Sequence, residues 1–126
     1  MVFFGGLFTL LAIILSAYFE HAVKGTVTDK QFSSLKIALD FHFLHSVSIF
    51  LVGLFTVASD KMIHITLLPY AVYAWMVGVL LFSISIYLNV IFQWSFVSKL
   101  IPVGGFSLML GWLIITAIGA QILWNS

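Results

Sequence analysis

The chain has 126 residues, of which 63% are hydrophobic and 7% are charged. Soluble domains carry charge at about a quarter of their positions, so this composition predicts an integral membrane protein in contact with the lipid bilayer. A net charge of +1 and the absence of arginine argue against a nucleic-acid partner. The absence of cysteine excludes disulfides, iron–sulfur clusters and a thiol nucleophile.

Four apolar stretches predict transmembrane helices, at about residues 2–19, 35–58, 65–92 and 103–124. The first is expected to be a retained helix rather than a cleaved signal peptide, because no basic segment precedes its long apolar run. The third is longer than a ~30 Å hydrocarbon core requires and should tilt or project. Short connections favour antiparallel neighbours, so we predict an all-α fold, a single four-helix transmembrane bundle over residues 1–126.

The lysines predict an orientation in the membrane. Lys24, Lys30, Lys36 and Lys99 belong to the first and third connections, whereas the opposite side has only Lys61 and the terminal amine. By the positive-inside rule, both termini should face away from the cytoplasm. The expected location is the inner (plasma) membrane of a bacterium.

Ionisable residues are concentrated in the second apolar stretch. It contains Lys36, Asp40, His42 and His45, and each such group costs at least ~2.5 kcal/mol near the centre of a transmembrane helix. The two histidines are three residues apart and therefore share a helix face. Together with polar residues at the ends of the first and third stretches, they predict a one-sided pocket that opens toward the lysine-rich connections. Its candidate residues are Glu20, His21, His42, His45, Ser85 and Asn89.

Several roles are open for these residues. The histidines can hydrogen-bond between helices, transfer protons or bind a small ligand. Metal or haem ligation through His21, His42 and His45 is a weaker option, because no Glu-x-x-His pattern accompanies them. Lys36 and Asp40 lie roughly 120–180° around the helix from the two histidines, which favours an interfacial ion pair or a contact with another subunit, such as a second copy in a homo-oligomer.

Small residues form stripes along the predicted helices. Without a hydrophobic driving force in lipid, helices associate where small side chains let their backbones approach. The glycines expected to serve this packing are Gly53, Gly78, Gly104, Gly105 and Gly111.

Four segments together resemble a known family. SAYFEHAVKG is similar to the GAFGAHALKG-type box of the small membrane family catalogued as domain of unknown function 423, and DFHFLHS to its second box. The DFHFLHS segment is especially similar to the eukaryotic branch known as transmembrane protein 256, and FSISIYL and IPVGGFSLMLGW resemble the third- and fourth-helix signatures of the family. The chain departs from the pattern at Ser16, Phe19, Glu20 and Ile84. The resemblance implies a four-helix membrane protein and supplies no activity. It marks His21, Lys24, Gly25, Ala38, His45, Ser83, Ser85, Tyr87, Pro102, Gly104, Gly105, Gly111 and Trp112.

No nucleophile elbow, phosphate-binding loop or metalloprotease motif is present, so we predict no catalytic residues and no firmly implied cofactor. The leading hypothesis is a non-enzymatic accessory, assembly or interaction subunit that works through its polar pocket. One alternative is a proton, ion or small-solute transport module. A further alternative is a haem- or quinone-associated redox subunit.

Overall fold

The computed structural model describes residues 1–59 and 66–125 of the chain. Within them there are no strands, and four helical segments are long and apolar enough to cross a membrane: Val2–Val23, Asp29–Ala58, Leu68–Phe92 and Ser95–Asn125. The all-α, four-helix prediction is therefore confirmed. Lys61 and the predicted start of the third span at residue 65 lie outside the described residues.

Three of the four segments combine different kinds of helix. The first and third contain π-helical turns, η1 and η2, and the fourth begins with a 3₁₀ turn, η3. The elements in chain order are α1 (Val2–Tyr18), η1 (Phe19–Val23), α2 (Asp29–Ala58), α3 (Leu68–Val79), η2 (Leu80–Ile84), α4 (Ser85–Phe92), η3 (Ser95–Lys99) and α5 (Leu100–Asn125).

The second helix begins at Asp29, earlier than the predicted residue 35, because of a capping box. The Thr28 hydroxyl accepts a hydrogen bond from the Gln31 backbone N–H (3.2 Å), and the Gln31 side chain accepts one from the Thr28 N–H (2.9 Å). This reciprocal pair satisfies two otherwise unpaired donors at the helix start. A prediction from apolar residues alone omits these polar first turns.

Replacing the capping residue, Thr28→Ala, should lower the stability of the protein by about 1 kcal/mol, because the Gln31 N–H loses its acceptor. Thermal unfolding in detergent micelles, followed by circular dichroism, measures the loss. The matched control is Ser33→Ala, at an exposed position of the same helix. Equal melting temperatures for the two variants would contradict a stabilising role for the cap.

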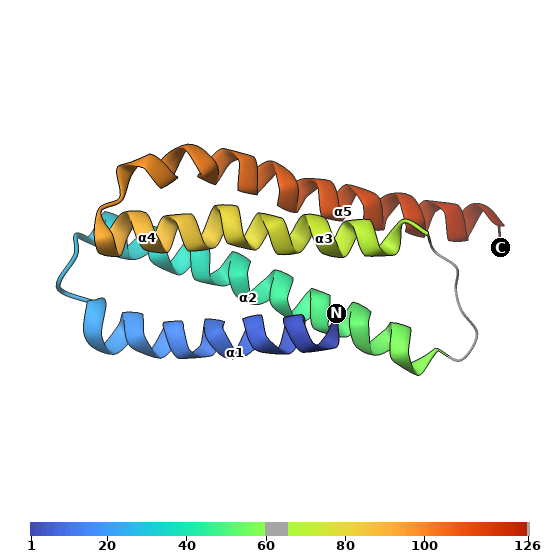
Figure 1. Ribbon diagram of the computed structural model, residues 1–126, viewed down its shortest axis with the longest axis horizontal. Helices are drawn as coiled ribbons and strands as arrows, with labels where there is room; N and C mark the ends of the chain where they lie inside the picture. The colour runs from blue at the N-terminus through green and yellow to red at the C-terminus, as the bar shows by residue number, and fades with distance from the viewer. Residues whose placement is uncertain (60–65, 126) are drawn as a thin grey trace.

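The helices are arranged as two pairs that meet through α2 (Figure 1). α1 packs along α2, and α5 packs along α3 and η2. α2 also contacts α3, η2 and α4, and these contacts join the first pair to the second. Both connections described by the structure, around residues 24–28 and 93–94, lie at the same end of the bundle, and the chain termini point toward the other end (Figure 1).

Glycines allow the closest contacts within each pair. A Cβ atom at Gly53 of α2 would lie 2.6 Å from the Val2 nitrogen, and one at Gly5 of α1 would overlap the Phe50 backbone. In the other pair, a Cβ atom would overlap Leu108 at Gly78, the Phe82 backbone at Gly104 and the Trp75 ring at Gly111. At Gly105 the nearest atom, in the Phe82 ring, is at an ordinary 3.8 Å.

Most of the buried apolar side chains in the described part of the chain form two core clusters. The first lies near the connections and contains Phe19, Val23, Leu35, Ala38, Tyr87 and Val90. The second lies farther along the bundle and contains Ile49, Val72, Trp75, Val79 and Leu108. Most other large apolar side chains are exposed on the outside of the helices, as expected of surfaces that face lipid.

Candidate functional site

His45 is buried and both of its ring nitrogens are hydrogen-bonded within the protein. Its Nε2 accepts a hydrogen bond from the Trp112 indole Nε1 (2.9 Å). Because an indole N–H can only donate, the ring proton is on Nδ1, which donates to the Phe41 carbonyl (2.6 Å). His45 therefore links α2 to α5 as a neutral imidazole, and neither nitrogen is free to bind a metal or haem iron.

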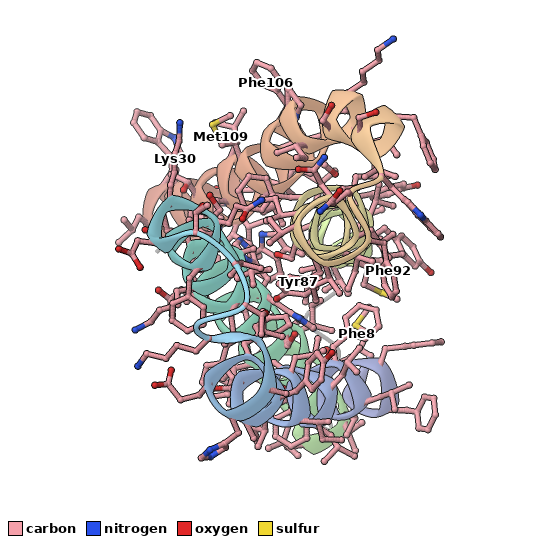
Figure 2. The ribbon with its side chains drawn as sticks, turned by 90° about the vertical axis from the view of Figure 1, so that its left-hand side faces the viewer. Phe8, Lys30, Tyr87, Phe92, Phe106 and Met109 are labelled. Atoms are coloured by element: carbon pink, nitrogen blue, oxygen red, sulfur yellow. The ribbon has the colours of Figure 1, made fainter. Side chains whose placement is uncertain are left out.

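His42, one helical turn earlier, makes different contacts. Its Nδ1 shares a hydrogen bond with the Tyr87 hydroxyl (3.2 Å), and Figure 2 shows Tyr87 at the centre of the bundle, between α4 and α2. The other ring nitrogen, Nε2, is buried and has no hydrogen-bond partner among the residues that the structure describes. Ser83 adds a second link between the helices, because its hydroxyl donates to the Ala38 carbonyl (2.8 Å).

The six residues predicted for the polar pocket occupy three separate places. His42, His45 and Ser85 are buried in the interior. Glu20 and His21 are exposed on the outer side of η1, and Asn89 donates to the Trp94 carbonyl (3.2 Å) at the end of α4. The cause is the register of η1: Phe19 and Val23 point inward, and the Phe19 ring packs on Tyr87 with 5.1 Å between ring centroids.

A groove of about 680 Å³ lies on the outer face of α1 and α2 and contains the exposed polar residues. We call it the outer groove. Its charged end carries the carboxylates of Glu20 and Asp40 beside His21, and the rest of its lining is mainly apolar. The remaining lining residues are Ala12, Ile13, Ser16, Ala17, Leu39, Phe43 and Leu44.

The charges around the outer groove are unevenly paired. Glu20 forms an ion pair with Lys24. Asp40 and Lys36 are both exposed and do not pair with each other. Asp40, predicted to contact another subunit, thus lies in the same groove as Glu20 and His21.

The described residues contain no group of three His, Asp or Glu side chains placed to hold one metal ion. The interior instead carries an aromatic cluster around His45. The rings of Trp75 and Trp112 lie 4.8 Å apart, and each has its centroid 6.1 Å from that of His45. Sequence reasoning missed the His45–Trp112 bond, although both residues belong to the segments that carry the family resemblance.

Four membrane-length helices with a hydrogen-bonded interior and an outer groove define a small integral membrane protein. The chain belongs to the family described as protein of unknown function (DUF423), whose model matches residues 15–105. The matched residues include His42 and His45, η1, all of α2 and the whole third span.

Curated relatives from bacteria are similar over most of the chain. The UPF0382 membrane protein YwdK of Bacillus subtilis is 26% identical over 122 residues, covering 97% of each chain. The UPF0382 membrane protein SH2409 of Staphylococcus haemolyticus is 24% identical over 114 residues, covering 90% of this chain and 89% of the relative. A Haemophilus influenzae relative is 23% identical over 101 residues, covering 80% and 77%. No solved structure matches the chain. The relatives agree with the assignment to a membrane and give no activity.

Proposed function

We propose that this protein is a non-catalytic accessory or assembly subunit of the membrane that holds one amphiphilic ligand in its outer groove. The observation that carries the proposal is the groove itself, which joins an apolar floor to a charged end. An amphiphile has the same division, an apolar body and a polar head, and would match both parts.

The size of the outer groove favours an amphiphile over a partner helix. Its volume of about 680 Å³ falls within the ~300–1,000 Å³ of small-molecule sites. At ~1.5 Å per residue, the stretch from Ala12 to Glu20 runs ~12 Å along the first helix, from the apolar part of the groove to its charged end.

The hydrogen bonds of the interior favour a structural role for it, as a rigid frame behind the outer groove, over a role as a reaction centre. His45 is satisfied by Trp112 and Phe41, and Ser83 by the Ala38 carbonyl. These bonds hold α2 against η2 and α5, so the α2 wall of the outer groove is fixed. A transport route is less well supported, because the second core cluster fills the far half with apolar side chains.

With both termini on the non-cytoplasmic side, as the lysines predict, the charged end of the outer groove would face the cytoplasmic leaflet. The ligand would then enter from that leaflet. A gate in the protein interior is not required.

Blocking the outer groove should remove the ligand without unfolding the protein. Ala17 is an exposed lining residue, so Ala17→Phe fills the groove from its surface. We expect native mass spectrometry of the gently extracted wild-type protein to show an adduct of lipid mass, and Ala17→Phe to lose most of it.

The matched control is Ala120→Phe, at an exposed position of α5 away from the outer groove, which should keep the adduct. A bare wild-type protein would contradict the proposal, as would equal adducts on both variants. Excess mass from a second polypeptide in place of a lipid would replace the amphiphile with a protein partner and overturn this assignment.

A further inference from the structure

We infer that the occupant of the outer groove is a phospholipid whose headgroup carries a protonated amine with N–H donors. This inference rests on the proposed function and specifies its ligand. It follows from the distribution of charge at one end of a groove that is otherwise lined mainly by apolar side chains.

The Asp40 carboxylate is the group in the outer groove that would bind a cation. It lines the outer groove beside Leu39, Phe43 and Leu44, and it forms no ion pair with any residue that the structure describes. A carboxylate beside apolar, lipid-facing side chains is costly unless a cation or hydrogen-bond donors reach it. A lipid ammonium group in the groove would supply both.

The neighbouring charges favour a zwitterionic headgroup over a simple cation. Glu20 is already paired with Lys24, whereas Lys36 is exposed one helical turn from Asp40 and forms no ion pair with the residues described by the structure. One turn is ~5.4 Å along the axis. An amine bound at Asp40 would therefore leave the phosphate of the same headgroup within reach of the flexible Lys36 side chain.

The type of amine follows from hydrogen bonding. A primary ammonium can donate directly to the Asp40 carboxylate, and charge-assisted hydrogen bonds are stronger than contacts between charges alone. A trimethylated ammonium has no N–H to donate. An anionic headgroup without an amine would place its charge next to Glu20 and Asp40 and should bind least well.

The test compares three phospholipids with identical acyl chains: phosphatidylethanolamine, phosphatidylcholine and phosphatidylglycerol. Each is titrated into the delipidated full-length protein, and binding is read by native mass spectrometry. We expect phosphatidylethanolamine to bind up to about fivefold more tightly than phosphatidylcholine, as for an exposed charge pair, and phosphatidylglycerol to bind least tightly. Asp40→Asn should abolish this preference while still binding lipid.

Asp29→Asn is the matched control, because Asp29 is an exposed carboxylate on the same helix outside the groove lining. It should keep the preference, and Asp40→Glu should restore it in part. Equal binding of the three lipids to the wild-type protein would overturn the headgroup assignment and leave the amphiphile site intact. Equal binding of the ethanolamine and choline lipids alone would overturn the role of the N–H donors. No lipid binding at all would overturn the proposed function as well.

Discussion

Gly104→Ala is expected to destabilise the protein by about 1–3 kcal/mol, the usual cost of overpacking a filled interface. The added Cβ would overlap backbone atoms of Leu81 and Phe82 in η2. Backbone atoms cannot move aside by changing rotamer, so α5 would have to separate from the third span. Thermal unfolding in detergent micelles measures the effect.

The adjacent glycine provides a matched control. At Gly105 the nearest atoms belong to the Phe82 ring, at 3.8 Å and beyond, so a methyl group fits. Gly105→Ala should leave stability unchanged or raise it slightly, because alanine is favoured over glycine inside a helix by up to about 1 kcal/mol. Similar melting temperatures for the two variants would show that α5 does not pack at Gly104 as described.

His45→Phe is expected to cost about 1–3 kcal/mol, because it keeps a flat ring at this position but leaves the Trp112 N–H and the Phe41 carbonyl without their side-chain partner. Trp112→Phe should cost less, since it removes only one of the two hydrogen bonds. The loss in each case is measured by unfolding in the same micelles.

A double-mutant cycle isolates the bond between the two rings. The combined variant should be less destabilised than the sum of the single variants, with a coupling of ~0.6–1.7 kcal/mol, the range for hydrogen bonds between transmembrane helices. Strict additivity would mean that the His45–Trp112 contact contributes nothing to stability. The exposed Trp124→Phe provides a control for loss of an indole alone.

The helices themselves could be predicted because their signals are local. Apolar length identified four membrane spans, and the start of α2 differed only where polar residues of the capping box extend the helix beyond the apolar run. The small-residue stripes also led to Gly53, Gly78, Gly104 and Gly111, which the structure places at close helix contacts. Gly105, predicted to pack with them, lies on a side of α5 with more space.

The grouping of polar residues could not be predicted in the same way. Glu20 and His21 follow the buried Phe19 directly, and only the register of the π-helical turn turns them away from the two histidines. Asp40 joins them because α1 packs beside that face of α2. Helical periodicity gives the face of a residue but does not identify the helix that covers it.

The sequence by itself determined the class of this protein, a four-helix membrane protein of the DUF423 family, together with the shared helix face of His42 and His45. These properties depend on composition and on spacing within one helix. Only the tertiary structure decided that His45 bonds Trp112, 67 positions away, and that the charged residues line an outer groove. Those arrangements depend on how the helices pair, which is decided by contacts between residues far apart in the chain.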